Sequence, residues 1–157
     1  MPLMKTFRNL FLFGIMLFAA ISVQAQTPPV DDNGLAIGGY DVVSYFSGTA
    51  QRGSKSYAVK HHGATYYFAS KANQNAFKKS PNSYLPQFDG YCAWGVGAKD
   101  AKFPINPETY TVIDGKLYLF FNGPFNGEPF NTYEDWAQRT TELKTAAHAK
   151  WPKVKKQ

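Results

Sequence analysis

Two short runs of β-prone residues, 56–60 and 64–68, stand on either side of the sequence His61-His62-Gly63. Branched and aromatic side chains favour strands, and a short connection that contains glycine favours a tight reversal of the chain. This part of the sequence therefore predicts a β-hairpin.

A helix is predicted directly after this hairpin. Ser70 can cap its first turn, and Pro81 marks its end, so we expect the helix to run to about Lys79. Apolar residues recur on one face of this segment at helical spacing. The residues expected to face inward are Ala72, Ala76 and Phe77.

A second hairpin is predicted around Asp114-Gly115, between the runs 110–113 and 116–121. This residue pair tolerates the positive backbone angles of a two-residue turn. Turn residues follow at 122–124 and 127–129.

The longest helix is predicted from about Thr132 to Lys150, closed by Trp151-Pro152. Acidic residues in its first turn and lysines towards its end match the helix dipole. Its inward stripe is expected to contain Tyr133, Trp136, Ala137, Thr140, Leu143 and Ala147.

These elements predict an α+β fold, a small single domain with two β-hairpins and helices packed on one face. The two hairpins could share one small sheet. The apolar run 40–46 is too short to distinguish a helix from a strand, and the aromatic stretch 84–95 has no clear period. Aromatic residues form 17% of the chain, which is enough to build a core from large side chains.

Residues 1–25 have the pattern of a secretory signal peptide. Lys5 and Arg8 precede the apolar run 10–21, and Val23-Gln24-Ala25 supplies small residues for cleavage near Ala25. The mature protein is thus expected to be periplasmic or secreted. No later segment has the roughly 20 apolar residues that a membrane-spanning helix needs.

The composition of the ends makes a nucleic-acid partner improbable. Removing Lys5 and Arg8 with the signal lowers the formal charge from +6 to +4, and lysines concentrate near the end of the chain. We interpret 153–157 as a solvated basic tail, because it shows no repeated basic face. Residues 26–34, rich in proline and aspartate, are predicted to be a flexible lead-in.

The segment 66–84, YYFASKANQNAFKKSPNSY, keeps the frame of a known motif. The chain resembles the YHS domain, a small module found beside heavy-metal transporters, in which an aromatic pair and two spaced cysteines precede a phenylalanine, a proline and a tyrosine. The residues in register are Tyr67, Phe68, Phe77, Pro81 and Tyr84.

Other segments extend this resemblance over most of the chain. They are similar to the exported bacterial branch of YHS-domain proteins, which lacks the metal-binding cysteines, and they imply a YHS-like domain over 35–152 whose run 40–46 is a short helical turn. These segments are 39–46, 90–93, 114–119 and 150–152.

The resemblance does not bring the family's metal site with it. Ser44, Ala69 and Asn73 stand where the three thiolates would lie. Structural zinc usually needs four cysteine or histidine ligands, which are too scattered here, whereas two or three such ligands suit Cu(I). The ligands considered for such a metal are Cys92, His61 and His62; His148 is expected to be solvated.

The adjacent residues His61 and His62 are expected to be exposed turn residues that do not chelate together, with one ring packed on Tyr66 or Tyr67. Neighbouring residues on a strand point to opposite faces. The alternative that they bind a metal remains open.

Cys92 is the chain's single cysteine, so it forms no intramolecular disulfide. One interpretation is a buried, inert side chain, and the other is a reactive thiol. Asp41 and Asp89 are expected to shape turns, and neither has a partner carboxylate at acid–base spacing, which argues against a hydrolase.

Two functional hypotheses follow. The first is an exported binding or accessory module, with no enzymatic signature, for a soft metal ion, a small ligand or a protein partner. Its site would be an aromatic pocket formed by Tyr67, Tyr91, Cys92 and Trp94. The alternative is a thiol redox protein or sensor that uses Cys92 as the nucleophile.

Overall fold

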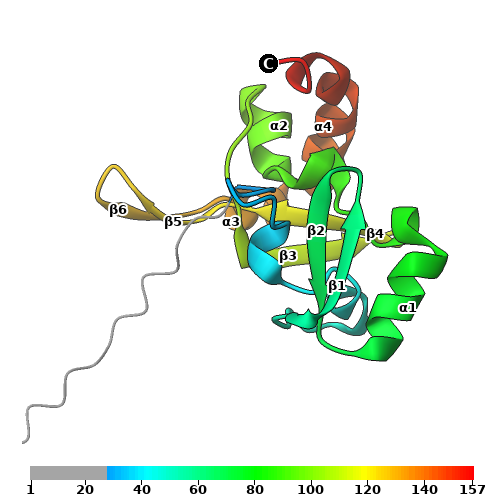
Figure 1. Cartoon of the computed structure of the whole chain (residues 1–157). Helices are drawn as coiled ribbons and strands as arrows, with labels where there is room; N and C mark the ends of the chain where they lie inside the picture. The colour runs from blue at the N-terminus through cyan, green and yellow to red at the C-terminus, as the bar shows by residue number, and fades with distance from the viewer. Residues whose placement is uncertain (1–27) are drawn as a thin grey trace, which may run out of the picture.

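The computed structural model describes residues 28–157, so the predicted signal peptide lies outside the described residues. The described chain has an α+β fold, as predicted, with four α-helices and three two-stranded antiparallel hairpins (Figure 1). The hairpins form three separate sheets, because no strand of one hairpin pairs with a strand of another among these residues.

The first hairpin joins β1 (Ser54–His61) to β2 (Ala64–Phe68). Its turn places His62 and Gly63 at φ angles of 46° and 81°. Both the hairpin and its turn confirm the prediction, although His61 belongs to the strand.

Helix α1 (Lys71–Lys79) follows, and the Ser70 hydroxyl accepts a hydrogen bond from the Asn73 N–H at 3.1 Å, as a capping residue does. Phe77 is buried as predicted, but Ala72 is exposed and Gln74 is buried instead. The Gln74 amide can be buried because it donates to the carbonyl of Ala58 in β1 at 3.0 Å.

Helix α2 (Ala93–Lys99) lies in a stretch that showed no helical period in the sequence. It packs against α4 (Thr140–Val154), as Figure 1 shows. A Cβ atom at Gly97 would lie only 2.7 Å from the carbonyl oxygen of Leu143, so glycine permits this close approach.

The second hairpin, β3 (Asn106–Ile113) with β4 (Lys116–Phe120), confirms the Asp114-Gly115 turn, whose φ angles are 52° and 69°. Strand β4 crosses the middle of the core, and four of its five residues are buried. The largest fully buried side chains are Trp136, Tyr45, Tyr118, Phe68, Phe77 and Phe120.

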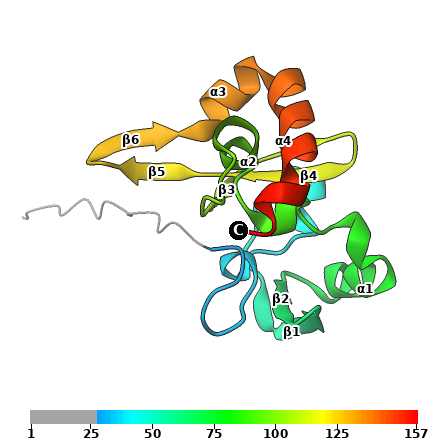
Figure 2. The ribbon, with the colours of Figure 1, turned by 90° about the horizontal axis from the view of Figure 1, so that it is seen from above.

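The third hairpin, β5 (Asn122–Phe125) with β6 (Glu128–Asn131), occupies a region predicted as turns. It extends away from the body in Figures 1 and 2. Pro124 faces Pro129 across the pair. Proline lacks an N–H and is rare within central strands, and these residues therefore had the sequence pattern of a turn.

The long helix predicted for 132–150 is two helices, α3 (Thr132–Gln138) and α4, separated at Arg139. The Arg139 guanidinium lies at the break and pairs with Asp135 of α3 at 3.1 Å and with Glu142 of α4 at 2.7 Å. Of the predicted inward stripe, Trp136, Leu143 and Ala147 are buried, Tyr133 and Thr140 are half-buried, and Ala137 is exposed.

Both ends of the described chain pack more closely than expected. Helix α4 continues through Pro152 to Val154, whose side chain is fully buried. In the segment expected to be a flexible lead-in, the Asp31 carboxylate accepts hydrogen bonds from the N–H groups of Asn33 and Leu35, both at 2.9 Å. This side-chain turn organises residues 31–35, because aspartate can accept hydrogen bonds from backbone groups that follow it.

No helix within 28–157 is both long and apolar enough to cross a membrane.

Candidate functional site

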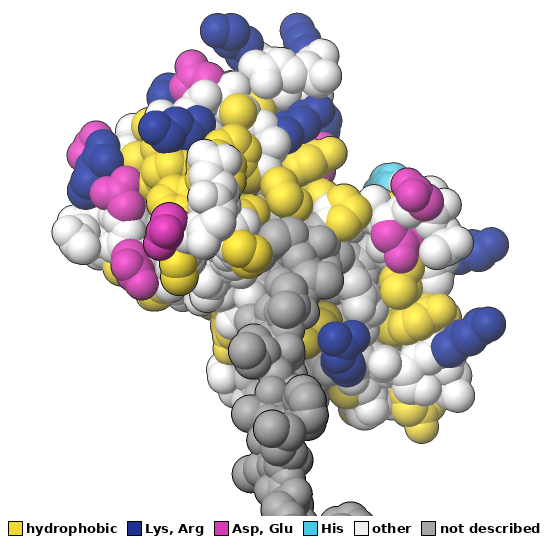
Figure 3. Space-filling view, turned by 90° about the vertical axis from the view of Figure 1, so that its left-hand side faces the viewer, with side chains coloured by type: hydrophobic (Ala, Val, Ile, Leu, Met, Phe, Trp, Pro, Cys, Tyr) yellow, Lys and Arg dark blue, Asp and Glu magenta, His cyan; other side chains and the backbone are white. Residues whose placement is uncertain are grey.

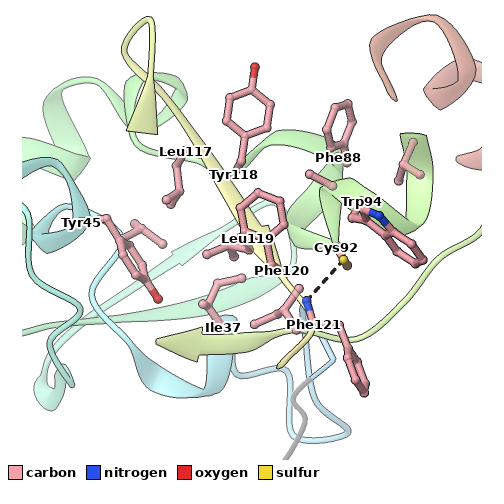
Figure 4. Close-up of a cluster of buried hydrophobic side chains, with 14 of the residues drawn as sticks. Ile37, Tyr45, Phe88, Cys92, Trp94, Leu117, Tyr118, Leu119, Phe120 and Phe121 are labelled. Carbon is pink, nitrogen blue, oxygen red and sulfur yellow. Dashed lines mark hydrogen bonds between the residues drawn. The ribbon is translucent and has the colours of Figure 1, made fainter. Parts of the chain in front are cut away.

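Cys92 is fully buried at the N-cap of α2. Its Sγ accepts hydrogen bonds from the N–H groups of Gly95 at 3.5 Å and Phe121 at 3.3 Å; Figure 4 shows the latter. The Thr132 hydroxyl lies 3.4 Å from Sγ and donates to the carbonyl of Phe121. The thiol proton is therefore directed at the Thr132 oxygen.

Burial raises the pKa of the Cys92 thiol, although the surrounding hydrogen bonds act in the opposite direction. A reactive cysteine needs a lowered pKa and access to its substrate. The geometry of Cys92 is that of a neutral thiol that joins the start of α2 to Phe121, the residue after β4, and to Thr132 at the start of α3.

The other three residues of the predicted aromatic pocket have separate surroundings. Tyr67 lies beside Gly39, whereas the Tyr91 ring faces Trp151 with centroids 6.4 Å apart. Trp94 donates from its indole N–H to Asp135 at 2.6 Å. Among residues 28–157, no ring contact joins Tyr67, Tyr91 and Trp94 to one another.

The three positions at which the YHS resemblance places thiolates converge on the buried carboxylate of Asp41. One oxygen accepts from the Ala69 N–H at 2.8 Å and the Asn73 side-chain amide at 2.7 Å. The other accepts from the N–H groups of Val43 at 2.8 Å and Ser44 at 3.3 Å. Asp41 thus shapes a turn, as predicted, and also links that turn to α1.

These residues do not fit a metal ion at this place. Four N–H donors already satisfy the carboxylate, and serine, alanine and asparagine supply no thiolate. More generally, no three histidine, cysteine, aspartate or glutamate side chains within 28–157 form a group that could hold a metal. Cys92, His61 and His62 are therefore not brought together as one ligand set.

The two histidines lie closer together than the strand pattern predicted. Their ring centroids are 4.1 Å apart at an interplanar angle of 79°. Their side chains do not simply alternate across a strand because His62 has a φ of 46° and belongs to the turn. One of the two histidine rings was expected to pack on Tyr66 or Tyr67, and the His61 ring centroid lies 6.4 Å from that of Tyr66.

The His61 ring combines partial exposure with a buried nitrogen. Its Nε2 atom is excluded from solvent and has no hydrogen-bond partner among the described residues. Burial, together with the neighbouring His62, lowers the pKa of His61 and favours its neutral form.

A groove of about 510 Å³ lies beside this histidine pair. Its volume falls within the range of small-molecule pockets, about 300–1,000 Å³. The polar and aromatic residues of its lining are His61, His62, Tyr66, Asp89 and Lys155, and the apolar ones are Pro29, Val30, Ile37, Ala64, Leu85 and Pro86. Figure 3 shows one face of the molecule, where exposed hydrophobic side chains lie among charged ones.

Three residues of the groove lining have a left-handed backbone: Ile37, His62 and Asp89 have φ angles of 49°, 46° and 52°. Histidine and aspartate adopt this region comparatively readily in turns, so the strain lies at Ile37. For the β-branched Ile37 this conformation is especially unfavourable. Next to Asp89, Gly90 packs so closely that a Cβ atom there would lie 3.0 Å from Cδ1 of Ile37.

Asp89 and Lys155 form an ion pair within the groove lining, with 3.1 Å between Oδ2 and Nζ. Burial raises the pKa of the Tyr66 hydroxyl, and the negative charge of Asp89 raises it further. Asp89 reaches the groove from the 3-10 turn Gln87–Gly90, and Lys155 follows the end of α4.

Sequence reasoning singled out His61 and His62 and treated Asp89 as a turn residue, but it missed Ile37 and Lys155 as groove residues. The Gly38-Gly39 pair was the one local signal of unusual backbone near Ile37. Lys155 gave no such signal, because its position depends on where α4 ends.

A scan against models of known protein families and searches of curated proteins and solved structures found no match to this chain. The resemblance to YHS-domain proteins therefore rests on the residue motifs, and the site on its geometry.

Proposed function

We propose that this chain is an exported, YHS-like binding module that holds a small ligand in the groove beside His61 and His62. The observation that carries the proposal is a ligand-sized groove that combines apolar walls with a few polar groups and includes the β-branched Ile37 at a positive φ. Strained conformations persist where the surrounding structure enforces them, and they cluster at binding and catalytic sites.

The groove supports binding better than the surroundings of Cys92 do. The Cys92 sulfur is buried and surrounded by its own hydrogen-bond partners, whereas the groove is open and combines apolar walls with a few polar groups. This combination is typical of small-molecule sites, in which apolar surface supplies affinity and polar groups fix orientation.

A small organic ligand suits this groove better than a soft metal ion. Neutral imidazoles are good metal ligands, but the described residues supply two of them at the groove and no third group at metal-binding distance. Cu(I) remains the metal to test, because it accepts few ligands and tolerates imidazole.

The test is a titration of the exported, purified protein with a panel of small aromatic and apolar compounds, followed by two-dimensional ¹H–¹⁵N NMR. We expect shifts to concentrate at the groove residues. Val30→Trp should block binding, since Val30 lines the groove and is 43% exposed, so a larger side chain fits without disturbing the core. Lys78→Trp, on the exposed side of α1, is the matched control.

Anaerobic titration with Cu(I) belongs to the same experiment. If Cu(I) binds to the original protein but not to the variants His61→Asn and His62→Asn, the ligand of the groove is a metal ion and not an organic compound. Binding of any compound that maps away from the groove, or that survives Val30→Trp unchanged, would contradict the proposed site.

A further inference from the structure

We propose that the ligand of this groove is a small organic cation, an amine with an apolar body, whose ammonium group takes the place of Lys155 beside Asp89. This inference rests on the proposed binding function and adds the chemical class of the ligand.

An alkylammonium group already lies at the Asp89 carboxylate. Lys155 Nζ is 3.1 Å from Asp89 Oδ2, and both side chains line the groove. A primary amine attached to an apolar chain is chemically what a lysine side chain presents. Lys155 thus acts as an internal competitor for the position of the ligand's ammonium group.

The ion pair between Lys155 and Asp89 is easily exchanged. The side chains of Lys155 and Asp89 are 58% and 57% exposed, and ion pairs at such positions contribute little to stability. A ligand that forms the same pair against an apolar wall gains additional contacts that Lys155 lacks.

A cationic ligand would displace Lys155 from Asp89, whereas an anionic ligand would displace Asp89 from Lys155, so the ligand's charge depends on which partner moves more easily. Asp89 is held in place by a short side chain on a left-handed backbone between Phe88 and Gly90. Lys155 has a long side chain with several rotatable bonds, and while its Nζ pairs with Asp89 it also lies 5.9 Å from the Trp151 ring centroid. Lysine is therefore the partner that moves, and the carboxylate is the partner that stays.

The remaining groove walls suit a cation. The ring of Tyr66 offers an aromatic surface, and its hydroxyl lies within the field of Asp89. His61 is kept neutral near pH 7 by its partial burial and by His62, so it does not repel an ammonium group. The charged and titratable groups that line the groove are Asp89, Lys155, His61, His62 and Tyr66.

Three probes of matched shape test the charge preference: 2-phenylethylammonium, 2-phenylethanol and 3-phenylpropionate, titrated separately at pH 7.5 and followed by NMR. We expect the cation to bind about twofold to fivefold more tightly than the neutral compound, because the ion pair with Asp89 is exposed, and more tightly still than the anion. Asp89→Asn should remove that advantage. The control is Asp114→Asn, which breaks the similar ion pair of Asp114 with Lys144 elsewhere on the surface.

Lys155→Gln supplies the sharper test. Removing an internal competitor should tighten binding of the cation about twofold to fivefold, whereas a lysine that merely supports the groove would weaken it when removed. Lys156→Gln, one residue further on and exposed, should change nothing.

The outcomes separate this inference from the proposed function. Equal binding of the cation and the alcohol at the groove would leave the binding function in place and overturn the amine. Tighter binding of 3-phenylpropionate, lost in Lys155→Gln, would also overturn it. If none of the three probes binds while other compounds of the panel occupy the groove, the amine is again wrong; if nothing binds the groove, the proposed function fails.

Discussion

The side-chain amide of Asn73 donates a hydrogen bond of 2.7 Å to the carboxylate of Asp41, which connects α1 to the turn before the 3-10 segment Ser44–Ser47. The same oxygen also accepts from the Ala69 N–H. One buried carboxylate thus joins segments that are far apart in the sequence, which is the structural task that a metal ion performs in small metal-binding domains.

Asp41→Asn should lower the free energy of unfolding by about 3 kcal/mol, because a buried charge with four donors would be replaced by an amide whose NH₂ group faces N–H donors. Urea unfolding followed by tryptophan fluorescence measures this change. Asp32→Asn, at an exposed position, is the control and should be neutral. A loss below about 1 kcal/mol would show that the Asp41 network contributes little.

A triple substitution tests the resemblance itself. Ser44→Cys, Ala69→Cys and Asn73→Cys together should create a site that binds Zn²⁺ or Cu(I), because all three positions surround one carboxylate. The original chain should show no binding at this place.

Thiolate–metal absorbance during an anaerobic titration detects the site, and the variant that keeps Asn73 but carries the other two cysteines should bind more weakly. A folded triple variant without metal affinity would argue against the alignment of these positions with the YHS thiolates.

The elements that could be predicted from the sequence are those that local chemistry determines. Ser70 caps α1, and Asp114-Gly115 forms a turn, because each depends on residues only a few positions away. Helix α2 was missed because its glycines lower helix propensity, and it forms by packing Gly97 against Leu143.

The groove was harder to predict because it, too, depends on contacts between residues that are far apart in the sequence. His61 and His62 were recognisable as candidate ligands, but Asp89 and Lys155 meet them only through tertiary packing. The positive φ angle of Ile37 could not be predicted from its residue type, because isoleucine ordinarily avoids positive φ angles. Similarly, the burial that raises the pKa of Cys92 depends on β4 and α3, which are distant in the sequence.

Cys92 should react slowly with thiol reagents in the native protein. Burial excludes the reagent, and the raised pKa leaves almost no thiolate near pH 7. We expect the reaction with 5,5′-dithiobis(2-nitrobenzoate) to be about a hundredfold slower than in urea, where the same thiol is exposed and serves as the control. A native rate that equals or exceeds the unfolded rate would restore the redox hypothesis.

Stability should fall as the pH is lowered from about 7 to about 5, partly because of two histidines. Burial is the main cause that lowers the pKa of both His61 and His148 in the folded protein. The unfolded chain therefore binds more protons in this range, so stability is present above the unfolded pKa and declines as the pH drops through and below it. The measurement is the free energy of unfolding in urea as a function of pH.

Single variants separate the two contributions. His61→Gln and His148→Gln should each reduce the slope between pH 7 and 5, and the double variant should reduce it further, since the two residues lie in different parts of the fold and share no contact within 28–157. The carboxylates whose pKa is lowered by ion pairs, such as Asp114 beside Lys144, lose their contribution at lower pH and leave this window largely unaffected. An unchanged slope in the double variant would mean that the fold lowers the pKa of neither imidazole.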